Sequence, residues 1–579
     1  IGDVIFFQGG VAWNRGVVAA FEKVTGKRII VPPHHDVTGA IGAALLAMRE
    51  TRGEGGRRFH GFDLSARACD STSFTCKGCD NLCEIRRVSF GGERPLFYGA
   101  RCERYERDDG RKARGIPDYF AARERLLLAA GGAETQGDLD AVRRYPPHSP
   151  PLGRVAIPRI LHLYDFFPYW REFFRTLGYE VVLSECTNPS IIHSSVEKVA
   201  TETCFPVKIA HGHAMSLLDE KPDYLFLPSV ISMARSSARA VQSYCCPLVQ
   251  AIPYILRSSL DMDRAGVKIL EPPLLYLRGR EAVERSLRSM ARGMGVAPGR
   301  VREALAAAEE AQARFWREMR ALGRKALDAL GPSDRAVVVM GRPYNNYDAG
   351  VNLNLPRKLR NLGATPIPQE FLDADAVDIY DQFPNMFWRY GQRLVASAHI
   401  VRNDPRLFAV YLSNFKCGPD SFIEHFFRSK MEGKPYLQIE IDEHSADAGI
   451  ITRCEAFLDS LANHRGAPPA RDWKFRHVPS KTRRTLYIPL MSLHAHAFAA
   501  AVRALGYPSE ALPESDERTI EIGRQFASGR ECLPVITTTG DMLKKLFEPG
   551  FDHRTAAFFM PTATGPCRFG QYVQMHRMI

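Results

Sequence analysis

Short apolar runs alternate with amphipathic stretches along most of this chain. From residue 154 onward, the runs 160–164, 224–227 and 336–340 have the length and composition of buried strands. Helical periodicity lies between them, which predicts parallel sheets flanked by helices. Residues 1–50 show the order strand, glycine turn, helix, strand, loop and helix, with the first strand predicted to be buried. The predicted fold class is therefore α/β, in several domains.

One helix is predicted to stand apart from this alternation. Apolar side chains recur at three- and four-residue steps through 298–330, and Gly331-Pro332 ends the run. The repeat is too short for an extended coiled coil. We therefore expect a bridging helix over 298–332.

The chain also contains an internal repeat. Two motifs recur in the same order, each copy 328 positions after the first, and both copies then reach a Leu-Pro or Met-Pro strand end. The first copy contains Arg175-x-Leu177-Gly178-Tyr179, Cys204-x-Pro206-Val207 and Leu227-Pro228, and the second contains Arg503-x-Leu505-Gly506-Tyr507, Cys532-x-Pro534-Val535 and Met560-Pro561. Self-similarity of this kind predicts duplicated, parallel-sheet α/β lobes, with 154–230 equivalent to 485–563.

These patterns divide the chain into seven parts. The proline cluster 146–151 cannot continue a regular element and indicates a boundary near 153. The expected parts are the closing edge of an α/β domain (1–52), a cysteine-rich module (60–105), a linker (106–153), a first lobe (154–297), the bridging helix (298–332), a middle lobe (333–464) and a truncated second copy of the first lobe (465–579). Both ends of the chain are expected to be cut, because the sequence starts inside a strand and ends without a stop signal.

Composition excludes several classes of protein. The 579 residues are too many for one core, and 45% hydrophobic with 25% charged residues is ordinary for globular protein. The formal charge of +12 comes largely from arginines with acids beside them, which favours a solvated surface over a nucleic-acid site. No apolar run is long enough to predict a membrane span.

Cysteine usage points to reduced thiols and metal. Thirteen cysteines in a large chain, some in Cys-x-x-Cys spacing, indicate a cytoplasmic compartment rather than a disulfide framework. Cys76, Cys79 and Cys83 lie in one polar turn, with Cys102 following. Metal sites need several thiolates that converge, so these four predict a zinc or iron-sulfur site; a group of buried free cysteines is the alternative.

A second set of cysteines lies in turns between strands and helices. Cys204 and Cys532 are expected at helix starts, where the helix dipole favours a thiolate. Cys417 and Cys567 lie in similar glycine and proline turns. The shared setting favours ligation over packing, and we expect all four to face a common cleft between lobes, because ligands gather outside the carboxyl ends of strands.

Other polar residues are assigned to packing. Cys245-Cys246 lies in an apolar segment and is expected to be packed, and three further cysteines belong to no motif. Alternate histidines diverge on a helix, so the two His-x-His pairs are also expected to pack. No Ser/His/Asp arrangement, Walker loop or zincin motif is present. The residues concerned are Cys69, Cys186, Cys454, His211, His213, His494 and His496.

A glycine pair follows the first strand. Gly9-Gly10-Val11-Ala12 precedes Asn14 at the expected start of a helix. Backbone N–H groups in such a turn can approach a nucleotide closely. A strand-to-helix turn also needs glycine for its geometry alone, so spacing does not decide between the two.

These motifs together resemble a known group of proteins. The glycine pair, 30–34 and 39–44 are similar to the end of the ATPase domain of the BadF/BadG/BcrA/BcrD family, which has an actin-like fold. This resemblance implies that Gly9, Gly10 and Asn14 face ATP. It also implies that the phosphate-binding loops would precede residue 1, so the chain alone is not expected to hydrolyse ATP.

The rest of the chain resembles the region fused to that ATPase in long activase-related proteins. That region is similar to subunits of 2-hydroxyacyl-CoA dehydratases. The segments that carry the resemblance are 76–83, 202–208, 341–345, 417–422 and 565–572. Activases of this kind use ATP to send a low-potential electron to a dehydratase cluster.

The resemblance therefore implies an iron-sulfur electron-transfer or reductase component, with a 4Fe-4S cluster and ATP as cofactors. Whether the chain is itself an enzyme stays open. The expected partners are a dehydratase-like or other reductase and a small-molecule or CoA substrate, with no nucleic acid or membrane; a homodimer is also left open. The alternative is a zinc-stabilised scaffold that docks an ATPase to a partner enzyme. An iron-sulfur protein is brown and a zinc protein colourless, which separates the two.

Overall fold

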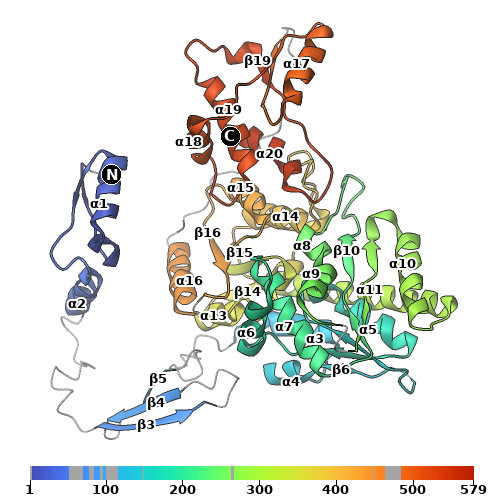
Figure 1. Ribbon diagram of the computed structural model, residues 1–579. Helices are drawn as coiled ribbons and strands as arrows, with labels where there is room; N and C mark the ends of the chain where they lie inside the picture. The colour runs from blue at the N-terminus through green and yellow to red at the C-terminus, as the bar shows by residue number, and fades with distance from the viewer. Residues whose placement is uncertain are drawn as a thin grey trace. The chain divides into compact units, whose positions relative to one another are not determined.

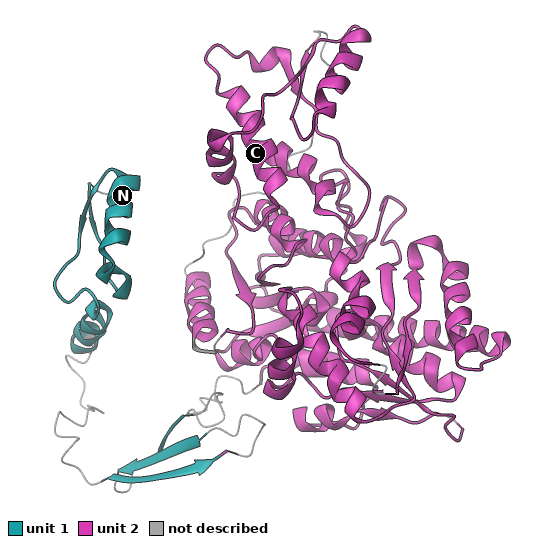
Figure 2. Cartoon of the chain, viewed as in Figure 1, with its two compact units in different colours: residues 1–75, 84–99 teal, residues 76–83, 100–579 magenta. Residues whose placement is uncertain are grey.

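The computed structural model describes residues 3–50, 69–76, 84–90, 95–99, 115–147, 149–262, 266–445, 447–462, 464 and 484–579. The chain forms two compact units, which Figure 2 shows in different colours: unit 1 contains 1–75 and 84–99, and unit 2 contains 76–83 and 100–579. None of the helices in the described ranges combines the length and the hydrophobicity that a bilayer crossing requires.

The first part of unit 1 has the predicted order of elements. β1 and β2 pair in parallel, with Val4 opposite Arg28. Phe6 is 66% exposed, so the first strand, predicted to be buried, is not covered by the described residues of this unit. The elements are β1 (Val4–Phe6), the 3-10 turn η1 (Gly10–Trp13), α1 (Arg15–Thr25), β2 (Arg28–Ile30) and α2 (Thr38–Glu50).

The second part of unit 1 is a three-stranded antiparallel sheet that the sequence did not predict. It consists of β3 (Cys69–Thr75), β4 (Glu84–Phe90) and β5 (Leu96–Tyr98), in that order. Its strands lie within the range 60–105, which was expected to be a compact cysteine-rich metal module.

Unit 2 begins with a lobe built on a five-stranded sheet. The strand order is β11-β9-β7-β8-β6, and every pair is parallel except β6 with β8. A separate parallel pair joins β10 and β12. The strands are β6 (Arg144–Tyr145), β7 (Arg154–Ile157), β8 (Glu180–Leu183), β9 (Tyr224–Phe226), β10 (Ser229–Ser232), β11 (Lys268–Leu270) and β12 (Pro273–Leu275).

Helices surround this sheet. The core between sheet and helices is rich in aromatic side chains such as Trp170, Phe174 and Phe226, all fully buried. The helices are α3 (Tyr119–Leu128), α4 (Gln136–Ala141), α5 (Leu163–Leu177), α6 (Pro189–Lys198), α7 (Phe205–Asp219), α8 (Pro247–Gln250), α9 (Ile252–Ser259), η4 (Tyr276–Arg278) and α10 (Arg280–Gly293).

Two expectations for this region need correction. The run 160–164, predicted as a strand, is the turn into α5, and the strand itself is β7, immediately before it. The predicted linker 106–153 contains α3, α4 and the edge strand β6. Its apolar residues Leu127 and Leu139 are buried in the core, and Arg123 is buried against Asp165, so tertiary packing orders a segment whose local composition looks like a linker.

The bridging helix is confirmed as α11 (Pro298–Asp328). It packs along α5, and its buried face includes Leu305, Phe315 and Met319. Near its end it touches the middle lobe, where a β-carbon at Gly323 would lie 2.7 Å from the Cα of Phe371.

The middle lobe is a four-stranded parallel sheet in the order β14-β13-β15-β16. All six residues of the central strand β13 are buried, as are all eight of β15. The elements are β13 (Ala336–Gly341), α12 (Pro343–Asn346), α13 (Leu355–Asn361), β14 (Thr365–Pro368), η5 (Gln369–Phe371), η6 (Ala374–Ala376), α14 (Arg389–Asn403), β15 (Leu407–Asn414), α15 (Asp420–Lys430), β16 (Tyr436–Ile441) and α16 (Asp447–Ala462).

The last lobe contains a three-stranded parallel sheet in the order β18-β17-β19. In Figure 1 this lobe, drawn in red, adjoins the middle lobe where α20 lies beside α15. The elements are β17 (Thr485–Ile488), α17 (His494–Ala504), β18 (Ser509–Ala511), α18 (Glu517–Arg524), α19 (Leu533–Leu546), η7 (His553–Thr555), β19 (Ala556–Phe558), η8 (Arg568–Gln571) and α20 (Tyr572–Met578).

The last lobe and the first lobe share their order of elements. The three strands of the last lobe are arranged as β8-β7-β9 are in the first. Positions 328 residues apart also play the same roles: Asn188 and Asp516 each cap a helix by accepting a 2.9 Å hydrogen bond from the backbone N–H of Ile191 and Thr519, respectively. Other pairs at this offset are the left-handed helix ends Gly178 and Gly506, the helix caps Cys204 and Cys532, and the tightly packed Gly212 and Gly540.

Candidate functional site

The carboxyl end of β13 is the centre of the candidate site. Ligands bind at such ends of parallel sheets, because the strands there give way to turns and helix starts. The turn after the strand carries Arg342, whose Nη2 lies 2.6 Å from Oδ1 of Asp420, with both side chains almost fully buried. The Ser413 hydroxyl donates to the other oxygen of Asp420 at 2.8 Å. The carboxylate of Asp420 thus compensates for the buried charge of the guanidinium.

Three thiols lie around that charge. Cys204 caps α7 and Cys246 caps α8, each followed by a proline in the first turn of its helix. Cys417 lies in the turn between β15 and α15. All three raise the pKa of the buried Tyr344, after the larger effect of burial, which places them close together beside the turn that follows β13.

Burial keeps these thiols protonated. Burial, followed by the neighbouring Cys246, raises the pKa of Cys204 to about 12. Burial and then Asp420 raise the pKa of Cys417 well above its ordinary value, although Arg342 lowers it. The thiolate forms are therefore unfavourable unless a further cation compensates for the lost hydration.

Two of these cysteines stand at helix starts, where backbone N–H groups are near the sulfur. The backbone of Val207 lowers the pKa of Cys204, and the backbone of Leu248 and Val249 lowers that of Cys246. These contacts lower the pKa of each thiol and only partly offset the effect of burial. Hydrogen bonds of this kind stabilise negative charge on sulfur.

Several buried polar atoms near the thiols have no hydrogen-bond partner. They are Oγ1 of Thr203, Nε of Arg342, Oη of Tyr411 and Oδ1 of Asn414. Buried polar atoms are normally paired, so a cluster without partners often marks the place of a bound group.

The other two predicted thiols come from the last lobe. Cys532 caps α19, and its sulfur is 2.8 Å from the hydroxyl of Tyr572. Cys567 caps η8 and also acts on Tyr572, whose ring stacks on Phe422. The structure thus brings Cys204 and Cys417 close to Cys246, and Cys532 close to Cys567. The two groups adjoin, because a β-carbon at Gly418, next to Cys417, would lie 3.5 Å from Cδ of Arg568, next to Cys567. That all four predicted thiols face one cleft stays a prediction.

No metal centre is apparent among the residues that the structure describes, where no three His, Cys, Asp or Glu side chains are arranged to hold an ion. Cys76 is described and buried, whereas Cys79, Cys83 and Cys102 of the predicted module lie outside the described residues. Metal ligation at both sets therefore stays a prediction.

Sequence reasoning assigned Cys246 to packing, and it missed its place beside Cys204 and Cys417. The motif Gly341-Arg342-Pro343-Tyr344 could have indicated a site here, because it follows the most apolar predicted strand.

The histidine at position 213 has the predicted packing role. Its Nδ1 lies 2.8 Å from the hydroxyl of Ser184 and its Nε2 lies 2.9 Å from that of Thr187. Thr187 also donates to Asp348 at 2.6 Å, so this buried network joins the first and middle lobes.

The glycine turn of unit 1 has the geometry that the sequence predicted. Gly9 has a φ of 93°, which favours glycine, and open space surrounds the positions where β-carbons would stand at Gly9 and Gly10. The side chain of Asn14 caps α1, accepting from the N–H of Gly16 at 3.0 Å. Contact with a nucleotide stays a prediction.

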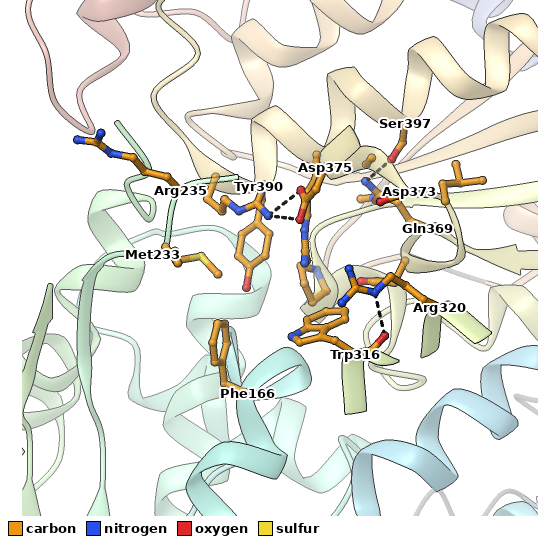
Figure 3. A pocket seen from close by; sticks show the side chains of 18 residues that line it. Phe166, Met233, Arg235, Trp316, Arg320, Gln369, Asp373, Asp375, Tyr390 and Ser397 are labelled. Atoms are coloured by element: carbon orange, nitrogen blue, oxygen red, sulfur yellow. Dashed lines mark hydrogen bonds and ion pairs between the residues drawn. The ribbon is translucent and has the colours of Figure 1, made fainter. Parts of the chain in front are cut away.

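A pocket of about 300 Å³ lies on the other side of the turn after β13 (Figure 3). Gly341 and Pro343 line it, whereas Arg342 and Tyr344, which alternate with them, face the thiols. Phe166, Met233, Trp316 and Leu372 supply apolar walls, and Arg235, Arg320, Arg389, Arg393, Glu370, Asp373 and Asp375 supply charge.

One deep group of this pocket has no partner. The hydroxyl of Tyr390 is without a hydrogen bond although the residue is only 6% exposed. In Figure 3 it points into the pocket, toward Phe166 and Trp316. Beside it, Gln369 is held by Gly341 and Ser397 and takes no further role in the pocket.

Comparisons with known proteins bear on unit 2. No curated protein matches the chain. Two structures of a periplasmic metal binding protein from Candidatus Liberibacter asiaticus align with it: a Mn-bound point mutant at 9% identity over 54% of this chain and 99% of that chain, and a metal-free point mutant at 10% over 53% and 98%. Both TM-scores are 0.17, which does not establish a shared fold.

A family model matches residues 154–372, and its description is "CoA enzyme activase uncharacterised domain (DUF2229)". The match begins at β7 and ends just after η5, so it includes Cys204, Cys246 and Arg342. This part of the chain is therefore similar to the DUF2229 domain, which is described as a domain of CoA enzyme activases.

Proposed function

We propose that this chain is an iron-sulfur electron-transfer or reductase component of an ATP-dependent activase system that serves a CoA-linked enzyme. The description of the matched domain supports the link to activases. The observation that carries the iron-sulfur role is the group of three free cysteines around the turn after β13, the buried Cys204 and the half-buried Cys246 and Cys417.

The residues present fit a cluster chemically. Thiolates are the protein ligands that iron-sulfur clusters use, and a cluster supplies one-electron transfer when it is bound. Burial would exclude water from the three sulfurs, and the N–H groups of Val207 and Leu248 would stabilise their negative charge. Arg342 would offset part of that charge, and the unpaired atoms nearby could then find partners.

The ATP-dependent part of the proposal depends on unit 1. The open turn at Gly9 and Gly10 is compatible with the close approach of a nucleotide, and Asn14 begins the helix that follows. By resemblance, Gly9, Gly10 and Asn14 would form part of an ATP site. The proposed partner is a dehydratase-like or other reductase that acts on a small-molecule or CoA substrate.

We further infer that 154–230 and 485–563 are duplicated lobes. The equal strand order and the shared roles at an offset of 328 residues support this. Cys532 is then the counterpart of Cys204, and with Cys567 it would provide thiols for a second site in the last lobe.

The test is iron and sulfide analysis of anaerobically purified chain. The wild-type protein should be brown and contain iron and acid-labile sulfide, and Cys204→Ser, Cys246→Ser and Cys417→Ser should each lose most of the iron from this site while staying folded. Cys454→Ser is the matched control, because Cys454 is a fully buried thiol of α16 that packs in a different hydrophobic cluster from Cys204, and this variant should keep its iron. Cys532→Ser tests the second pair in the same way.

Two outcomes would contradict the proposal. Iron content that is unchanged in all of the serine variants would remove the cysteines from the site. A colourless protein that contains zinc would instead favour the metal-stabilised scaffold.

A further inference from the structure

The pocket beside the turn after β13 carries more donors than it can satisfy internally. Tyr390 contributes a buried hydroxyl without a partner, and Arg320 has no carboxylate of the described residues within ion-pair distance. The Nε of Arg320 donates only to the backbone carbonyl of Trp316, at 3.3 Å. Unsatisfied donors that converge on a cavity select a ligand that accepts hydrogen bonds.

Three arginines lie along one wall, and two of them are paired with carboxylates. Arg389 makes a bidentate pair with Asp375, at 2.7 and 2.8 Å, and Arg393 lies 3.1 Å from Asp165. Although burial would raise the pKa of Asp375, Arg389, then Arg393 and Arg320, hold it below its ordinary value. Arg389 and Arg393 each have a carboxylate partner, so among the described residues Arg320 is the arginine of this wall that lacks one.

The remaining walls are apolar. Phe166, Met233 and Trp316 come from three different elements and surround the space into which Tyr390 points (Figure 3). The volume of about 300 Å³ is at the lower end of the range for ligand pockets, which suits a small molecule.

We propose that this pocket binds a small organic carboxylate, whose apolar body lies between Phe166 and Trp316 and whose carboxylate is held by Arg320 and the hydroxyl of Tyr390. The carboxylate supplies an acceptor for the hydroxyl of Tyr390 and a charged partner for Arg320, whose side chain is otherwise exposed to solvent. A neutral ligand of the same shape leaves the guanidinium unpaired, and an inorganic anion leaves the apolar walls uncovered. The binding requires no metal, so it stands apart from the iron-sulfur role.

The test is isothermal titration of the full chain with 4-phenylbutanoate and with hexanoate. We expect both to bind, and 4-phenylbutanamide, which has the same ring without the charge, to bind at least about tenfold more weakly. Acetate, which lacks the apolar body, should also bind at least about tenfold more weakly than hexanoate.

Two variants locate the binding. Arg320→Gln should weaken 4-phenylbutanoate by about tenfold, and Tyr390→Phe, which keeps the ring and removes only an unpaired hydroxyl, by about threefold to tenfold. Arg314→Gln is the matched control, because Arg314 is an exposed arginine of α11 outside the pocket lining, and should bind as the wild type does. Equal affinities for acid and amide, no binding of either acid, or full affinity in both pocket variants would overturn the proposal.

Discussion

Alternate residues at the end of β13 face in different directions and have different neighbours. Arg342 and Tyr344 face the three thiols, whereas Gly341 and Pro343 form part of the pocket wall. A side chain at position 341 would meet Leu412 and Asn346, so glycine is required there for close packing of the sheet. One short turn therefore separates a buried, thiol-rich region from a small-molecule pocket.

Glu370 gives the pocket a titration near neutral pH. Burial, opposed by Arg123 and Arg393 and helped by Asp165, raises the pKa of Glu370 from its ordinary 4.5 to about 7. The folded chain therefore holds this proton more tightly than the unfolded chain. The resulting stability is fully present below the ordinary pKa and is lost as the pH rises through about 7.

We predict that Glu370→Gln flattens this dependence, because glutamine cannot ionise. The wild type should lose more thermal stability than the variant between about pH 5 and about pH 8, as measured by the unfolding midpoint at each pH. Parallel curves for the two proteins would show that Glu370 does not titrate in this range.

At the scale of elements, two helix crossings depend on glycine. A β-carbon at Gly212 of α7 would overlap the carbonyl oxygen of Ile191 in α6, and one at Gly540 of α19 would overlap that of Thr519 in α18. Both contacts lie at the 328-residue offset, so the crossings are the same feature in the two lobes.

We predict that Gly212→Ala and Gly540→Ala each destabilise the protein by about 1–3 kcal/mol, because the helices must move apart to admit a methyl group. Gly299→Ala is the control: this glycine of α11 has open space around it, and alanine should be neutral or stabilising by about 0.5–1 kcal/mol. Urea unfolding of the three variants measures this, and equal stability of Gly212→Ala and Gly299→Ala would contradict the proposed crossing.

The sequence predicted elements well where periodicity was strong. α11 and β13 were predicted because apolar side chains repeat along them with the period of a helix or a buried strand. α3 was missed, because Arg123 and Glu124 make it look like a solvated linker. Its burial depends on Asp165 and Tyr164 of α5, which no local pattern reveals.

The site was predicted only in part for a similar reason. Cys204 was placed at a helix start by its proline and by its repeat in Cys532, and the structure has it there. Cys246 looked packed because its neighbours in sequence are apolar, and its approach to Cys417 depends on how two lobes meet. The pocket combines residues from many elements, and no motif pointed to it.

At the scale of the whole unit, ion pairs join the last lobe to the middle lobe. Nη1 of Arg530 lies 2.8 Å from Oε1 of Glu424, and Arg530 also pairs with Glu440. Glu424 is only 3% exposed. Nearby, His425 pairs with Glu531, and Phe422 stacks on Tyr572.

We predict that Arg530→Gln lowers the stability of unit 2 by about 1–3 kcal/mol, because it leaves a buried carboxylate without its charged partner. Adding Glu424→Gln should recover part of the loss, which a double-mutant cycle measures. Arg518→Gln is the control, since the pair of Arg518 with Glu521 is exposed and should contribute about 0–1 kcal/mol. Strictly additive losses in the cycle would mean that Arg530 and Glu424 do not interact.

The 31 residues of α11 form a single helix that contacts both the first and the middle lobe. One stretch lies along α5 of the first lobe, another closes on Phe371 of the middle lobe, and Trp316 and Arg320 between them form a wall of the pocket. If the first and middle lobes moved apart, α11 would have to separate from one of them and expose its apolar face to water. We therefore expect entry into the pocket to depend on rotation of the exposed side chains at its rim, Arg320 and Asp375, rather than on movement of whole domains.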